Sequence, residues 1–209
     1  MICKCPAATA LTSIPAVTCT DTFGQIQKIA FQRLKSSGTD NTFATGEAAN
    51  SIQLLASWTS RTSANDSTKI VVSPYIQAPT QEANAPRTFG GGNDTLGGIE
   101  IIVGREPNNF TAVFRGVPQS TIKVIKELEC EAAAGNLGVY LFNESGLIEG
   151  LKVGDDAKPI PILSLFVSDK AHGGLDTLDY NNIQFSFMPN YSDDLTIFTP
   201  TDFNPLTDL

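Results

Sequence analysis

The sequence is poor in the residues on which most enzyme sites depend. It has one histidine, His172, in 209 residues. A serine–histidine–aspartate site would need this histidine as its base, with Asp169 or Asp176 beside it, but the chain has no Gly-x-Ser-x-Gly turn to present a serine. We therefore expect His172 to lie in a solvent-facing loop, and we expect no catalytic residue and no cofactor.

Clustered carboxylates offer a second, weaker catalytic feature. Asp176 and Asp179 lie close together in the sequence, as do Asp193 and Asp194, and a pair of carboxyl groups can cleave a glycosidic bond. Acidic residues in turns, however, ordinarily cap and solvate loops. We interpret both clusters in this ordinary way.

Positive charge is scarce in the C-terminal part of the chain. The formal net charge is −8, and from Asp155 onward nine acidic residues stand against only Lys158 and Lys170. Binding of DNA or RNA depends on lysine and arginine, so this region is unsuited to holding nucleic acid. Such a surface can instead line a passage through which DNA slides without sticking, or it can simply keep the protein soluble.

Long apolar runs and an export signal are also missing. No stretch approaches the roughly 18 apolar residues that a membrane span needs, so we expect no membrane partner. The start, Met-Ile-Cys-Lys-Cys-Pro, has neither a basic beginning nor a long apolar run, which argues against a cleaved signal peptide.

Cysteines are few and are spaced unlike a metal site. The four are Cys3, Cys5, Cys19 and Cys130, with no Cys-x-x-Cys pair. We expect reduced thiols and no bound metal. A disulfide among the first three, or metal binding, are the alternatives.

The composition that remains is typical of a folded, mainly β protein. Hydrophobic residues make up 41% and charged residues 17%, with 17 glycines and 12 prolines to form turns. The fold class that we expect is α+β, mainly β: a β-sandwich or small barrel with one or two packed helices. We expect an extended arm over residues 1–24, a single β-rich domain over 25–200 and an irregular tail over 201–209.

Hydrophobic periodicity places the elements within that domain. Helices are predicted at 46–62 and from Pro118 to Gly135, where Ile122, Ile125, Leu128 and Ala132 share one side. A long loop is predicted over 77–98, followed by a hairpin of 99–105 with 110–115. The remaining strands are predicted at 25–34, 69–76, 137–142, 147–153, 160–167, 183–188 and 195–198.

The glycine-rich segment 89–98 (FGGGNDTLGG) is the most unusual part of the predicted loop. It lacks the Gly-Lys-Ser/Thr ending of a phosphate-binding loop, and as a single glycine-rich calcium repeat it would supply only half a site. We interpret it as a loop that becomes ordered against a neighbouring subunit. The residues that we expect to make subunit contacts are Phe23, Phe89, Gly91, Asn93 and Leu96.

Two segments resemble virion proteins of tailed bacteriophages. One is 5–33, CPAATALTSIPAVTCTDTFGQIQKIAFQR, and the other is 146–200, which includes GLIEGLKVG and KPIPILSLFVSDKAHGGLDTLDYNNIQFSFMPNYSDDLTIFTP. They are similar to ring and tail-tube-like proteins of crAss-like phages that infect Bacteroides. The resemblance lies in the general residue pattern and the order of the segments, and it includes no diagnostic motif.

This resemblance implies a structural subunit without catalytic residues. Copies would form a homo-oligomeric ring, in a head-to-tail connector or tail tube, around a channel that DNA traverses without specific binding. Neighbouring virion proteins would be the other partners, and assembly would take place in the host cytoplasm. The alternative is a surface adhesin or carbohydrate-binding β-sandwich, which would need an exposed aromatic platform; an enzyme is the third possibility.

Overall fold

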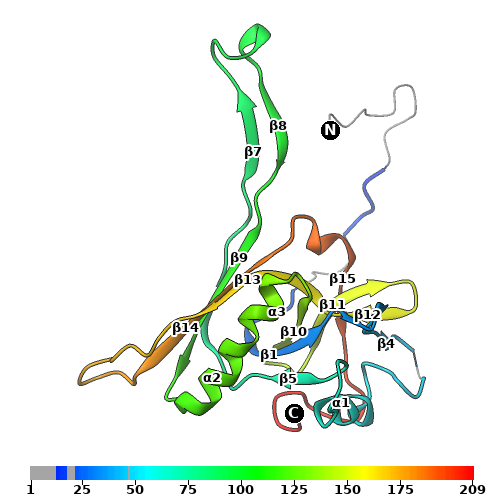
Figure 1. Ribbon diagram of the computed structural model, residues 1–209. Helices are drawn as coiled ribbons and strands as arrows, with labels where there is room; N and C mark the ends of the chain where they lie inside the picture. Colours follow the sequence, from blue (N-terminus) through cyan, green and yellow to red (C-terminus); the bar gives the residue numbers. More distant parts are fainter. Residues whose placement is uncertain (1–12, 18–21, 47) are drawn as a thin grey trace. The chain divides into compact units, whose positions relative to one another are not determined.

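A computed structural model describes residues 13–17, 22–46 and 48–209 (Figure 1). The chain divides into two compact units. The larger unit comprises Phe23–Ala83 and Pro107–Leu209. The smaller unit contains Asn84–Glu106 together with the N-terminal residues up to Thr22.

The centre of the larger unit is an antiparallel sheet that curls around an apolar core. Its path runs from β1 through β10, β13, β14 and β9 to β6. The backbone N–H of Ile76, just before β6, donates to the Gln27 carbonyl of β1 at 2.9 Å, so the last strand returns to the first. The six strands form a small open barrel, with a seam between β1 and β6. Their bounds are β1 Ile26–Arg33, β6 Gln77–Gln81, β9 Asn108–Arg115, β10 Leu137–Asn143, β13 Ile160–Val167 and β14 Tyr180–Phe187.

Further short strands extend this sheet beyond β10 and along β1. β11 pairs with β10, β12 and β15, β4 pairs with β12, and β5 pairs with β1. A separate two-stranded piece joins β2 to β3. The bounds are β2 Lys35–Ser36, β3 Thr39–Asp40, β4 Phe43–Ala44, β5 Ile70–Val72, β11 Ile148–Val153, β12 Asp156–Lys158 and β15 Leu195–Phe198.

Strand β10 separates two apolar cores. All seven of its residues are buried, because successive side chains point to opposite faces and both faces are covered. Leu137, Val139 and Leu141 enter the barrel core, whereas Tyr140 and Phe142 enter a second core on the other face. That second core is aromatic: the ring of Trp58 lies 5.3 Å from that of Tyr140 and 5.5 Å from that of Phe142.

The helices cover the outside of these cores. α2 (Gln119–Glu127) and α3 (Glu129–Ala133) confirm the helix predicted after Pro118, with a break at Leu128. The prediction of a helix over 46–62 is wrong for its first half, because α1 spans only Leu55–Thr62. Its first turn begins where the Leu55 N–H donates to the Asp202 carboxylate at 2.9 Å, a partner far away in the sequence.

The smaller unit contains a β-hairpin that the sequence reading mispaired. β8 (Glu100–Arg105) pairs with β7 (Pro86–Gly90), across a tip that includes the 3₁₀ turn η1 (Leu96–Gly98), and not with 110–115. Residues 110–115 belong to β9, which takes β14 and β6 as its neighbours. The predicted loop 77–98 is therefore also corrected, since it holds β6 and β7. Proline and glycine in QAPTQ and PRTFG hid both strands.

The C-terminal residues 201–209 contain no helix or strand, yet they are anchored to β1. Lys28 Nζ donates to the Leu206 carbonyl at 2.7 Å and to the Leu209 carbonyl at 2.9 Å. Leu206 is buried in the second core. The observed architecture thus confirms an α+β class that is mainly β.

Candidate functional site

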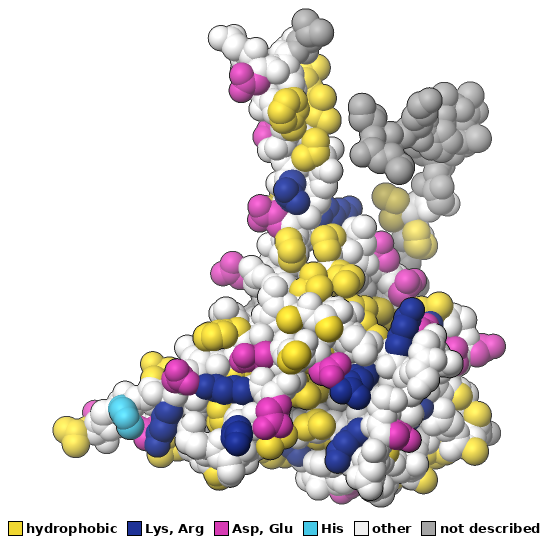
Figure 2. Space-filling view, in the orientation of Figure 1, with side chains coloured by type: hydrophobic (Ala, Val, Ile, Leu, Met, Phe, Trp, Pro, Cys, Tyr) yellow, Lys and Arg dark blue, Asp and Glu magenta, His cyan; other side chains and the backbone are white. Residues whose placement is uncertain are grey.

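The β7–β8 hairpin exposes apolar side chains on both of its faces. Ile101 lies opposite Phe89 and Ile102 lies opposite Thr88 in the ladder. Neighbouring residues of a strand point to opposite faces, so Ile101 and Ile102 place one apolar side chain on each face of the hairpin. Phe89 is 62% exposed, Ile102 68% and Val103 63%. Figure 2 shows these hydrophobic side chains gathered along the hairpin.

The tip of this hairpin has a defined shape. Gly90, Gly91 and Gly92 all have positive φ, a conformation that glycine adopts at little cost. The Gly91 N–H donates to Thr95 Oγ1 at 3.1 Å, and the same hydroxyl donates to the Ile99 carbonyl at 2.7 Å. A Cβ added at Gly90 would lie 2.0 Å from the Thr95 methyl carbon, so the close approach requires glycine.

The residues expected to make subunit contacts divide between the two units. Phe89, Gly91 and Asn93 belong to the hairpin, and Leu96 begins its 3₁₀ turn, although its side chain lies outside the described part. Phe23 belongs to the larger unit, where it packs in part against the barrel core. Four of the five candidates thus belong to the smaller unit and one to the larger.

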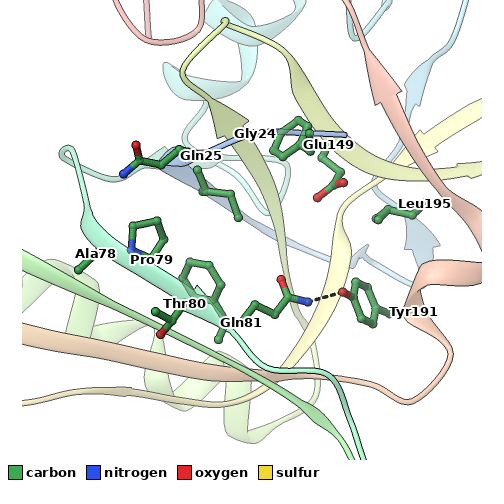
Figure 3. Close-up of a pocket in the computed structure, with 12 residues that line it drawn as sticks. Gly24, Gln25, Ala78, Pro79, Thr80, Gln81, Glu149, Tyr191 and Leu195 are labelled. Atoms are coloured by element: carbon green, nitrogen blue, oxygen red, sulfur yellow. Dashed lines mark hydrogen bonds between the residues drawn. The ribbon is translucent and has the colours of Figure 1, made fainter. Parts of the chain in front are cut away.

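Phe23 lines a cavity of about 560 Å³ at the barrel seam (Figure 3). The walls come from the start of β1, from residues 78–81 on β6, and from Tyr191 in the 3₁₀ turn η2 (Tyr191–Asp194). Gln81 Nε2 donates to the Tyr191 hydroxyl across the opening. The Tyr191 ring stacks on Phe187, with centroids 4.5 Å apart, and burial raises the pKa of its hydroxyl. The lining mixes apolar side chains, such as Phe110 and Leu195, with polar ones, such as Gln25 and Thr80.

His172 lies in the loop between β13 and β14, as predicted. It is 81% exposed, and its Nδ1 lies 3.3 Å from Asp179 Oδ1. Lys170 Nζ lies 2.7 Å from the other Asp179 oxygen, and its hydrogen bond lowers the pKa of that carboxyl group. Asp176, Asp193 and Asp194 are exposed.

Within the described ranges, no group of three or more histidine, cysteine, aspartate and glutamate side chains is placed to hold a metal ion. Cys130 is an exposed free thiol, and the expectations for Cys3, Cys5 and Cys19 fall outside the described residues. Among the described helices, none has the length and apolar character needed to cross a membrane.

The outer face of the barrel carries a polar row that the sequence reading missed. Pairing places Phe166 of β13 beside Gln184 of β14, Gln184 beside Thr111 of β9, and Thr111 beside Thr80 of β6. All four side chains are exposed, and on β9, β13 and β14 the alternate residues fill the core. Thr111 and Gln184 are shared by two shallow hollows of about 230 Å³ and 270 Å³. The alternation of polar and apolar residues in NNFTAV and NNIQFS is visible in the sequence, but the sequence does not show that these two strands pair.

Comparisons with known proteins add one structural neighbour. No protein-family model and no curated protein matches the sequence. Among solved structures, a chain of the anti-feeding prophage (AFP) baseplate, determined by cryo-EM and 6-fold symmetrised, aligns with a TM-score of 0.35 and 10% identity over 90% of this chain and 98% of that one. That neighbour comes from a prophage baseplate, and the comparisons do not support the specific likeness to crAss-like phages. Similarity of this extent does not establish a common fold.

Proposed function

We propose that this protein is a structural subunit of a phage neck or tail, which associates with further copies into a ring around a DNA channel. The main structural observation behind the proposal is the β7–β8 hairpin. It exposes Phe89, Ile101, Ile102 and Val103 to water.

A hairpin of this kind gains little stability from its own two strands. An isolated two-stranded ribbon is at best marginally stable in water. Each of its strands pairs only with the other in the described chain, so both outer edges keep unpaired backbone groups. Apolar patches and open strand edges are features that proteins cover by association. Contact with a neighbouring subunit would cover the apolar side chains and pair the open strand edge at the same time.

Two further features support a ring around DNA. The segments 5–33 and 146–200 resemble ring and tail-tube-like phage proteins, which bear no catalytic residues. The acidic excess from Asp155 onward would repel a DNA backbone and let it slide. Neither feature depends on the hairpin, so each can be tested separately.

The decisive experiment compares two single substitutions on exposed valines. Val103→Asp places a charge on the hairpin, and Val124→Asp places the same charge on α2, where the side chain is 49% exposed. We expect the unmodified protein to form a ring in negative-stain images and a multiple of the 22.3 kDa mass in light scattering. Val103→Asp should shift it to monomer, because a charge cannot be buried unpaired at an interface. Val124→Asp should leave the mass unchanged.

The proposal is wrong if the unmodified protein remains monomeric at high concentration and is missing from purified virions. It also fails if Val103→Asp and Val124→Asp have equal effects. A urea unfolding curve for each variant separates loss of association from loss of folding, because both sites are exposed.

A further inference from the structure

We infer that the outer face of β13, β14, β9 and β6 is a binding site for a neutral oligosaccharide. The site is centred on the row of Phe166, Gln184, Thr111 and Thr80. This inference concerns a different surface from the hairpin and does not depend on ring formation.

The side chains of the row match the two kinds of surface on a sugar. Phe166 is 50% exposed, so its ring can stack on the apolar C–H face of a pyranose. Gln184 carries an amide that both donates and accepts, which suits neighbouring sugar hydroxyls. Within the described chain, neither the Gln184 nor the Asn182 side-chain amide hydrogen-bonds to another protein group. These amides are therefore free for a ligand.

Other polar groups of the face are already oriented. Thr80 Oγ1 and Thr111 Oγ1 lie 2.6 Å apart, and Ser186 Oγ donates to Asn109 Oδ1 at 2.7 Å. Such pairs hold hydroxyl and amide groups in fixed positions while each retains further capacity for hydrogen bonds. Rigid strands thus present the polar atoms with little entropy left to lose on binding.

The absence of charge selects the class of ligand. The two hollows are lined only by uncharged residues, although 17% of the whole sequence is charged. An anionic polymer would need arginine or lysine, and a cationic one would need carboxylates. A subunit interface would need a larger apolar centre than Phe166 and Val113 provide. A neutral, hydroxyl-rich molecule fits this face best.

The backbone bends at both sides of the row. Ser164, in the irregular part of β13, has φ 55°, and Ala78, in the irregular part of β6, has φ 48°. Ser164 lines one hollow and Ala78 lines the other. Residues other than glycine seldom adopt positive φ, and bulges that re-aim side chains are frequent beside binding sites. The two bends flank the β14–β9 pair and frame its polar face.

The row is about as long as a short oligosaccharide. Four neighbouring strands enclose three spacings of about 4.8 Å, or roughly 14 Å in all. A single sugar would contact only part of the row. We therefore expect affinity to rise from monosaccharide to tetrasaccharide and then to level off.

Binding should be tested on the full chain with a fixed panel of neutral tetrasaccharides: cello-, malto-, xylo-, manno- and chitotetraose, with tetragalacturonate as an anionic comparison. Calorimetry should detect at least one neutral member. Phe166→Ala and Gln184→Ala should each weaken it by about fivefold or more, from the usual contribution of one aromatic or polar contact. The control Val124→Ala removes an equally exposed apolar side chain from α2 and should change the affinity by less than about twofold.

Several outcomes would overturn the inference. They are no binding of any neutral member, binding of tetragalacturonate alone, or equal affinity for the unmodified protein and both row variants. A change in oligomeric mass caused by Phe166→Ala would also overturn it, because the face would then be an interface between copies. The mass comparison of Val103→Asp with Val124→Asp tests ring formation, so the two proposals can fail separately.

Discussion

Strands β10 and β8 both contain a run of apolar residues, but their surroundings are opposite. β10 reads LGVYLFN and β8 reads EIIVGR, so both carry apolar residues on both faces. Every residue of β10 is buried between two cores. In β8, by contrast, Ile101, Ile102 and Val103 are all exposed.

The difference shows what an uninterrupted apolar run predicts. Such a run indicates a strand covered on both faces, but it does not identify what covers it. For β10 the covering comes from the same chain, through α2 and α3 on one face and Trp58 on the other. For β8 we infer that it comes from another molecule.

Truncating a buried side chain of β10 should lower the stability of the protein severely. In Phe142→Ala a fully buried ring that contacts Trp58 is lost, and large-to-small changes of this kind cost about 3–5 kcal/mol of unfolding free energy. Urea unfolding followed by the fluorescence of Trp58, the only tryptophan, measures the loss. A cost below about 1 kcal/mol would mean that the second core is loosely packed and that the contrast with β8 is unsound.

The two-sided burial of β10 should also make stability sensitive to alkaline pH. Burial raises the pKa of the Tyr140 hydroxyl above its usual value of 10.0. Because the folded pKa exceeds the unfolded one, this group's contribution is complete below about pH 10 and falls above it, by about 1.4 kcal/mol per pH unit. Tyr140→Phe should flatten the fall, measured as unfolding free energy between pH 9 and pH 11. Its hydroxyl lies a long 3.5 Å from the Ala157 carbonyl, so little should change at neutral pH. Parallel curves for the two proteins would contradict the assignment to Tyr140.

Removing the hairpin should leave the larger unit folded. Its base is narrow: the Glu106 N–H donates to the Ala85 carbonyl at 2.9 Å, and Asn84 Nδ2 donates to the Glu106 carbonyl at 3.2 Å. Replacing 86–105 with a short glycine–serine turn should change the unfolding free energy by about 1 kcal/mol or less, since loop length has a weak effect. Circular dichroism and urea unfolding check this result. A variant that fails to fold would show that β8 supports the core.

The smallest effect is expected for one side chain of β8. Ile102→Ala in the dilute, monomeric protein should change the unfolding free energy by less than about 0.5 kcal/mol, because Ile102 is largely exposed. The same change should lower the thermal midpoint at concentrations where rings form, since an interface residue then loses contacts. Equal shifts at both concentrations would argue against burial of β8 by association.

Most elements of the larger unit could be predicted from local patterns. β14 alternates between core and solvent along YNNIQFSF, and the strand predicted at 183–188 lies almost wholly within it. The helix after Pro118 also follows from its apolar spacing. Strand partners could not be predicted in this way. The segment 99–105 has a strong strand signal, yet its partner, PRTFG, has a weak one, so the nearer strand 110–115 was chosen wrongly.

The polar row was hidden for a related physical reason. The alternation of Thr111 and Gln184 with buried neighbours is visible in the sequence, but their adjacency depends on the pairing of β9 with β14. Phe166 is harder still to predict, because the register shift between Leu163 and Phe166 interrupts the simple alternation of β13. By contrast, the exposure of His172 followed from its glycine-rich surroundings alone.

The narrow base of the β7–β8 hairpin makes this segment a replaceable cassette. Its two ends are held together by hydrogen bonds between Asn84, Ala85 and Glu106, and a hairpin of another length or sequence can be joined at the same two points. If the hairpin makes the proposed subunit contacts, exchanging it would change the neighbour that is bound and leave the barrel unchanged.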